Sequence, residues 1–203
     1  MKIDLHVHAR ERSACSLASE EDQIRAALRA GLDGLAFTDH HRLAPVSRLK
    51  ALNARYAPFR IFRGIEISTD GEDVLVLGLH DLALENEFWP YPELHAFVRA
   101  RGGFIVVAHP FRYHPELSLD LERYPPDAVE GRSSNIPPRN EARIRALASQ
   151  LGVPVLRNSD AHSTREIGSH YNVLEDAQGG APASEAEVLA RLCSGPAACG
   201  AGR

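Results

Sequence analysis

Lysine is the residue type that this chain most clearly lacks. Among its 203 residues only Lys2 and Lys50 are lysines, so arginine carries nearly all of the positive charge. Arginine is suited to bidentate recognition of phosphate or carboxylate groups. The formal net charge is −4, so no overall basic field favours binding to nucleic acid.

Cysteines and long apolar runs are also scarce. Cys15, Cys193 and Cys199 form neither a CxxC pair nor a disulfide framework, which favours a reducing compartment. No apolar run approaches the roughly 20 residues of a membrane span, and no signal-peptide core follows Met1. We therefore expect a cytoplasmic protein that makes no membrane contact.

Several common catalytic and phosphate-binding motifs are absent. The sequence contains no GxxxxGK[ST], no GxGxxG and no GxSxG, and Cys15 lacks the spacing of a catalytic nucleophile. The length and the 44% hydrophobic content suit one sizeable core. We expect a single domain over residues 1–195 and a flexible Gly/Ala-rich tail over residues 196–203.

Strand-like and helix-like segments alternate along most of the chain. Apolar runs typical of strands lie at 2–8, 34–38, 61–67, 73–79, 104–108, 128–130, 153–157 and 171–174. Helical patterns lie at 20–30, 45–56, 92–101, 139–151 and 184–193. This order predicts a parallel sheet or barrel, and about seven such strands favour a compact TIM-like barrel. In such barrels the chemistry lies at the carboxyl ends of the strands.

Histidines and carboxylates gather at those strand ends. His6 and His8 are two residues apart on a strand, so both face the same side and can chelate one ion. Asp4 shares that side, and we expect it to orient an imidazole from behind. Asp160 and His162 form a second pair with the same spacing.

Three further strand ends add single groups. Glu66 closes an apolar strand, where a carboxylate is costly unless it meets a metal or another cation. His109 ends the longest apolar run, directly before Pro110. Only one of the neighbours His40 and His41 can face the site from an extended strand. Imidazole and carboxylate together are typical ligands of Zn, Mn or Fe.

These motifs, in this order, resemble the PHP (polymerase and histidinol phosphatase) superfamily. The resemblance covers residues 3 to about 174 and rests on five motifs: His6-x-His8, Thr38-Asp39-His40, Gly64-Ile65-Glu66, Ala108-His109-Pro110 and Ser159-Asp160-Ala161-His162. It implies a distorted (β/α)7 TIM-like barrel that holds one to three divalent ions (Zn, Mn or Fe). It selects His40 rather than His41, and it implies a metal-binding and catalytic set drawn from His6, His8, His40, Glu66, His109, Asp160 and His162.

Two positions depart from the family pattern. Ser13 stands where members commonly carry an Asp or His, and Leu75 stands where many carry a His. Glu11 or Cys15 are the nearby residues able to substitute for the first. The second and third metal sites would therefore each lack a ligand.

The resemblance implies a phosphoesterase that hydrolyses a small phosphomonoester or nucleotide-type substrate with a metal-activated water. Arg42 and Arg112 stand beside ligand motifs, and we expect them to bind the substrate phosphate. Two alternatives stay open: a degenerate PHP domain that binds metal or a partner without turnover, and an amidohydrolase-like enzyme, a class that usually has a bridging Lys. Nucleic acid is a less favoured partner, and the pattern indicates no oligomeric state.

Overall fold

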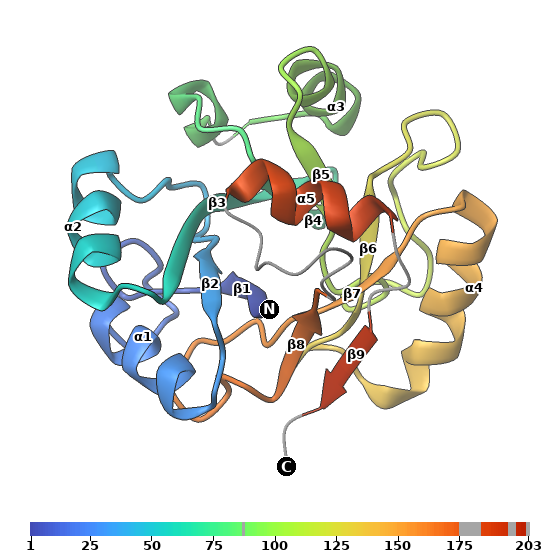
Figure 1. The fold of residues 1–203 in the computed structure, drawn as a ribbon. Coiled ribbons are helices and arrows are strands. Elements are labelled where there is room, and N and C mark those ends of the chain that lie inside the picture. Colours follow the sequence, from blue (N-terminus) through green and yellow to red (C-terminus); the bar gives the residue numbers. More distant parts are fainter. Residues whose placement is uncertain (87, 175–183, 195–197, 202–203) are drawn as a thin grey trace.

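A computed structural model describes residues 1–86, 88–174, 184–194 and 198–201 (Figure 1). Nine strands in this part of the chain form one sheet in the order β7-β6-β5-β4-β3-β2-β1-β8-β9. Their bounds are β1 Lys2–Val7, β2 Gly34–Phe37, β3 Arg60–Thr69, β4 Glu72–Leu77, β5 Phe104–Val107, β6 Ala128–Arg132, β7 Val155–Arg157, β8 His170–Val173 and β9 Ala198–Ala201.

The sheet curls until its two ends nearly meet. Val7 at the end of β1 bridges in parallel to Ala161 after β7. The backbone N–H of Arg157 in β7 donates to the side-chain oxygen of Asn172 in β8 at 3.0 Å. The predicted TIM-like barrel is thereby confirmed in a nearly closed form.

Strand β4 breaks the predicted strand–helix alternation, and β8 also runs antiparallel, to β1. β1, β2 and β3 are parallel, as are β5, β6 and β7, but β4 runs antiparallel to both β3 and β5. Asp70 and Gly71 join β3 to β4 with positive φ angles of 47° and 87°. So short a turn can make only a hairpin, because a parallel neighbour needs a crossover of about a dozen residues. β4 therefore starts at the barrel end where β3 and β5 finish.

Five α-helices cover the outside and one end of the barrel in the described residues. They are α1 Glu20–Arg29, α2 Val46–Tyr56, α3 Tyr91–Arg99, α4 Glu141–Leu151 and α5 Glu185–Ser194, with short 3-10 helices at Leu82–Glu85 and Pro138–Asn140. α1 begins at a side-chain cap, because Ser19 Oγ accepts the N–H of Asp22 at 3.2 Å. None of the described helices is long and apolar enough to cross a membrane.

The barrel interior is aliphatic at one end and polar at the other. Val188, Leu189 and Leu192 of α5 pack in one cluster with Ile3 and Leu77 from the barrel wall. Figure 1 shows α5 lying across the front of the strands. α5 thus covers the end where the parallel strands begin, and the ends that carry histidines and carboxylates lie on the opposite side.

The last described strand lies where the sequence predicts a flexible tail. β9 pairs antiparallel with β8, from His170↔Ala201 to Val173↔Ala198. The outer edge of β8 otherwise presents unpaired backbone groups, which a further strand can satisfy. Residues 198–201 of the expected tail thus form a strand, residues 196, 197, 202 and 203 lie outside the described part, and the flexible tail stays a prediction.

Candidate metal centre

The strand ends bring the predicted ligands together in one cup. Four overlapping groups of three side chains have ligand atoms within 4.8 Å of one another. The groups are His6/His8/Glu66, His6/His109/Asp160, Glu66/Asp73/His109 and His8/His40/His162. All seven residues that the resemblance assigns to metal binding are among them. Asp73 is an addition that the sequence did not indicate.

The innermost group combines two imidazoles with two carboxylates. His6 Nε2 lies 3.2 Å from Asp160 Oδ1 and 3.4 Å from Glu66 Oε1. His8 Nε2 lies 3.2 Å from both carboxylates and 3.1 Å from His6 Nε2. All four side chains are almost completely buried. Four ligand atoms therefore face one small volume from three different strand ends.

Hydrogen bonds behind the rings decide which nitrogens face this volume. His6 Nδ1 donates to Glu130 Oε1 at 3.0 Å, which leaves a lone pair on Nε2. His8 Nδ1 lies 3.3 Å from Ser13 Oγ, and that hydroxyl donates to Asp39 Oδ1 at 2.7 Å. His8 Nδ1 is therefore the donor and its Nε2 also presents a lone pair.

This arrangement tests whether the residues fit a metal. Two imidazole lone pairs and two buried carboxylates that converge repel one another unless a cation or protons lie between them. Two nitrogen and two oxygen ligands form a donor set typical of Zn, Mn or Fe(II). The residues present therefore fit a divalent metal ion.

The pKa values show the same demand for positive charge. Burial by itself lowers the pKa of both histidines, but the surrounding carboxylates outweigh it. The pKa of His6 rises well above its usual range, and that of His8 rises to about 9. Burial raises the pKa of Glu66 and Asp160, yet His6 and its neighbours bring both pKa values below their usual range. The carboxylates of the cup thus favour positive charge on the groups beside them.

Two further groups extend the cup. His109 Nε2 lies 3.0 Å from Glu66 Oε1, on the side away from His8. On the other side, His8 stacks on His40 with ring centroids 4.5 Å apart and on His162 at 4.3 Å. Glu66 thus lies at the centre, because its second oxygen is 3.0 Å from His40 Nδ1.

The side chains of the neighbours His40 and His41 lie in different surroundings. His40 joins the cup, while His41 Nε2 accepts the backbone N–H of Ser68 at 3.3 Å. His41 has a positive φ of 50°, which turns the chain between the two rings. His109 and Asp160 also have positive φ, at 26° and 52°. Such conformations are costly outside glycine and gather at functional sites.

The sequence interpretation of Asp4 is wrong. Asp4 Oδ1 accepts the backbone N–H groups of His6 and Ser159, at 3.2 Å and 3.0 Å, and Oδ2 accepts the Ser159 hydroxyl at 2.5 Å. Asp4 orients the backbone and not an imidazole. It precedes His6 by two residues on β1 and therefore lies deeper in the barrel. Burial raises the pKa of Asp4 to about 7. The ring of His6 is instead oriented by Glu130.

Glu130 is not among the residues predicted from the sequence, although a signal for it is present. Its oxygens accept from His6 Nδ1, from Asn158 Nδ2 at 2.9 Å and from the backbone N–H of His109 at 3.0 Å. Ala128-Val129-Glu130 is an apolar strand that meets a carboxylate, the same pattern that marked Glu66. The cost of burying a carboxylate, which indicated Glu66, indicates Glu130 in the same way.

The two candidate substrate-binding arginines lie in different places. Arg112 Nη1 is 3.8 Å from Asp160 Oδ2, at the mouth of the cup. The guanidinium of Arg42 is half exposed, 3.8 Å from Glu85 Oε2. Tyr113 follows Arg112, and its ring meets that of His109 edge-on at 5.8 Å. Arg112 therefore lies beside the ligands, and Arg42 lies on the outer rim.

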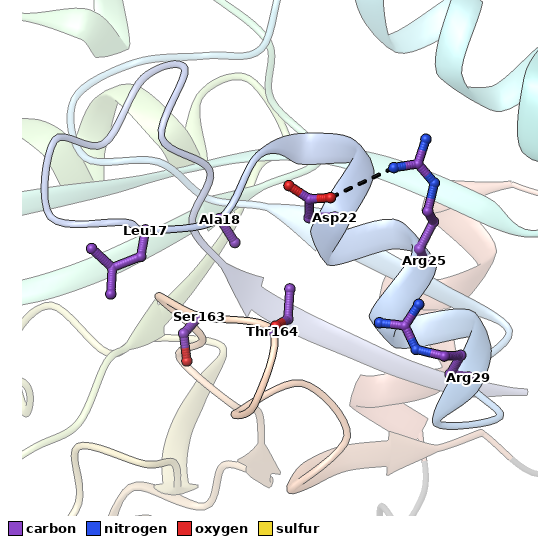
Figure 2. Close-up of a pocket in the computed structure, with 7 residues that line it drawn as sticks. All are labelled: Leu17, Ala18, Asp22, Arg25, Arg29, Ser163 and Thr164. Carbon is purple, nitrogen blue, oxygen red and sulfur yellow. Dashed lines mark ion pairs between the residues drawn. The ribbon is translucent and has the colours of Figure 1, made fainter.

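A separate cavity flanks the cup. It has a volume of about 340 Å³ and lies between α1 and the loop after His162 (Figure 2). The two sides are joined where the N–H of Leu17 donates to the carbonyl of His162 at 2.8 Å. Figure 2 shows Asp22 and Arg25 as an ion pair on its wall. None of the cup ligands lines it.

Comparisons with known proteins agree with this architecture. No curated protein sequence matches the chain. A family model described as PHP-associated matches residues 138–195. A two-domain protein from Bacteroides vulgatus that contains a predicted PHP-like metal-dependent phosphoesterase shares the fold with a TM-score of 0.75. It is 15% identical, and the match covers 100% of this chain and 65% of that one.

Two other structures share the fold at a TM-score of 0.66. PsfC from Pseudomonas syringae is 22% identical, with 93% of this chain and 87% of that chain covered. An amidohydrolase from Chromobacterium violaceum, with bound sulfate and no metal, is 16% identical, with 88% and 93% covered.

Fold and site together define an α/β barrel with a cup of histidines and carboxylates at its open end, whose side chains could hold metal ions. The match of residues 138–195 to the PHP-associated model and the barrel fold shared with a predicted PHP-like phosphoesterase both agree with the resemblance that the strand-end motifs indicate.

Proposed function

We propose that this protein is a metal-dependent phosphoesterase that hydrolyses a small phosphomonoester or nucleotide-type substrate. The observation that carries the proposal is the pairing of a buried cup of metal-type ligands with the arginine at its mouth, Arg112. Divalent ions in such a cup supply Lewis acidity and a water of lowered pKa at neutral pH. An adjacent guanidinium is suited to the oxygens of a phosphoryl group.

The side chains of the cup would have different roles in the reaction. His6, His8, Glu66 and Asp160 would hold the innermost ion, with Glu66 shared by a second ion near His109 and a third near His40 and His162. Glu130 fixes the His6 tautomer. Asn135 Nδ2 donates to Asp160 Oδ2 at 2.6 Å and fixes that carboxylate. Arg112 would bind the equatorial oxygens of the phosphoryl group as charge develops on them.

Arg42 would serve a different part of the substrate. Its guanidinium lies on the rim beside Glu85, outside the ligand cluster. From there it would meet the distal part of a larger substrate, such as a second phosphate of a nucleotide. Under this proposal, hydrolysis of a small phosphomonoester does not depend on Arg42.

The amidohydrolase alternative has weaker support. The Chromobacterium violaceum amidohydrolase shares the fold, and it holds a sulfate, a tetrahedral oxyanion like phosphate. Amidohydrolase sites usually have a bridging Lys. Here Lys2 Nζ lies over the ring of Tyr171 at 5.7 Å, and Lys50 is exposed on α2. Neither lysine belongs to the ligand groups of the described residues.

Metal content and hydrolysis, measured on one preparation, test the proposal. The protein would be purified without chelator and assayed with p-nitrophenyl phosphate, nucleoside mono- and bisphosphates, and an N-acyl amino acid. Mn, Zn or Fe(II) would be supplied in turn, with Asp160→Asn as the control. Phosphoester hydrolysis that follows metal content supports the proposal. Amide hydrolysis alone supports the amidohydrolase, and metal binding without turnover supports the degenerate domain.

A further inference from the structure

Strand β4 brings one more carboxylate to the cup, and it comes from the start of a strand. Because β4 is antiparallel to its neighbours, its first residues lie where β3 and β5 end. In register, Asp73 is opposite Ser68 and Leu75 is opposite Glu66. Side chains alternate along a strand, so Asp73 and Leu75 share the inward face. Asp73 is the one nearer the mouth.

The two inward positions have different surroundings. Leu75 is fully buried in the aliphatic cluster that fills the barrel interior, together with Leu5 and Val106. Asp73 is 4% exposed and lies among polar groups, with Oδ2 3.7 Å from His109 Nε2. Glu66, Asp73 and His109 all place a ligand atom within 4.8 Å of the others. Position 75 offers no ligand atom, and position 73 does.

Local contacts hold the Asp73 carboxylate in one orientation. Ser68 Oγ donates to Oδ1 at 2.6 Å, and the Tyr113 hydroxyl donates to Oδ2 at 2.8 Å. The backbone carbonyl of Asp73 accepts the N–H of Ala108 at 3.0 Å, which ties it to the end of β5. A carboxylate fixed from both sides is arranged in advance for a ligand.

Little positive charge compensates the carboxylate of Asp73. Among the described residues, no Lys or Arg forms an ion pair with it, and His109 is its only ion-pair partner. His109 is already 3.0 Å from Glu66. Asp73 thus shares its one imidazole with Glu66, which also contacts His6, His8 and His40. A buried carboxylate without sufficient positive charge is costly. A cation between the three side chains removes that cost.

We propose that Asp73 is a ligand of the second metal ion, together with Glu66 and His109, and that it replaces the ligand that position 75 lacks. The inference rests on the proposed function insofar as it needs a metal-loaded cup. It adds a ligand from β4, and it makes Leu75 part of the barrel packing. With Asp73 as a ligand, the second metal site would be retained, although Leu75 at the usual ligand position suggests its loss.

Metal stoichiometry tests the assignment independently of turnover. Wild type, Asp73→Asn and Tyr113→Phe would be stripped, loaded with excess Mn or Zn, desalted and analysed for ions per chain. Asp73→Asn is expected to hold one ion fewer than wild type, because a neutral amide is a poor ligand. Tyr113→Phe removes a hydrogen-bond donor to Asp73 but keeps the carboxylate, so it is expected to retain the full complement.

An Asp73→Asn protein that binds as many ions as wild type, with equal affinity, overturns the assignment. If that variant does not fold, anomalous diffraction from Mn-loaded wild type decides, since a ligand oxygen lies roughly 2.0–2.2 Å from its ion. Wild type that binds no metal contradicts both this assignment and the proposed function. Wild type that binds metal without hydrolysis contradicts the function alone, and the ion count still decides on Asp73.

Discussion

Glu130 Oε1 accepts a hydrogen bond from His6 Nδ1 at 3.0 Å, in a fully buried contact between β6 and β1. The other oxygen of Glu130 accepts the backbone N–H of His109 at 3.0 Å, after β5. One carboxylate therefore sets the orientation of two ligands on different strands. The tautomer of His6, and with it the direction of the Nε2 lone pair, depends on this residue.

Replacing Glu130 by Gln is expected to weaken metal binding by about 10–100-fold. The amide presents an N–H₂ group to neighbours that are all donors, so one of its contacts with His6, Asn158 or His109 is lost. Isothermal titration with Zn or Mn measures the effect. Glu141→Gln is the matched control, because Glu141 pairs with Arg132 and Arg145 and belongs to none of the ligand groups, so affinity is expected to be unchanged.

Removing an innermost ligand is expected to abolish turnover. His8→Ala and Asp160→Ala each delete a group that faces both Glu66 and His6, and metal-ion catalysis is worth several kcal/mol, roughly a thousandfold or more in rate. Steady-state assays with saturating metal measure the loss. A folded, metal-loaded variant with full activity would contradict the mechanism.

The two arginines are expected to behave differently on substitution. Arg112→Met should lower kcat/KM for every phosphoester by about 10–100-fold, as expected for a lost hydrogen bond to a charged group. Arg42→Met should leave p-nitrophenyl phosphate hydrolysis unchanged and raise KM only for substrates with a distal phosphate. Equal effects of both variants on p-nitrophenyl phosphate would show that the rim assignment of Arg42 is incorrect.

Metal binding at pH 7 is expected to release protons. In the metal-free protein the pKa of His8 is about 9, so its ring is protonated at neutral pH. A ligand nitrogen must give up that proton, and metal affinity should therefore fall as the pH is lowered. Titration calorimetry in buffers with different ionisation enthalpies counts the protons. Binding enthalpies that do not vary with the buffer would refute the prediction.

Asp4→Asn is expected to stabilise the metal-free protein at neutral pH. Burial raises the pKa of Asp4 to about 7, so ionisation is harder in the folded chain than in the unfolded one. Wild-type stability should then fall by about 2 to 3 kcal/mol as the pH rises from about 5 to about 8, whereas Asp4→Asn should lack this loss. Urea unfolding at several pH values in the presence of chelator makes the comparison. Parallel pH profiles for the two proteins would contradict it.

Much of the site could be predicted because each motif lies at the end of a parallel strand. Alternation along β1 places His6 and His8 on one face, and the barrel rule places the ends of β3, β5 and β7 together. These arguments need only local sequence and strand order. The choice between His40 and His41 is different, because it depended on the family resemblance.

The residues that were missed depend on register between strands. Asp73 begins a strand and follows a turn, where an acidic residue is ordinarily a surface residue. Only the hairpin, which reverses β4, moves that position to the mouth. Glu130 takes the role expected of Asp4 for a similar reason, since depth along the barrel axis is not visible in a single strand. Pairing with neighbouring strands fixes that depth.

The convergence of buried carboxylates and imidazole lone pairs also bears on how long the protein persists in a cell. An ion that binds only the folded chain stabilises it by about 4 kcal/mol when present at a thousandfold excess over its dissociation constant. Without it, the cup retains desolvated charges and left-handed backbone at His109 and Asp160. Under metal starvation the chain should therefore be cleared by proteolysis, so metal supply would set the abundance of the protein as well as its rate.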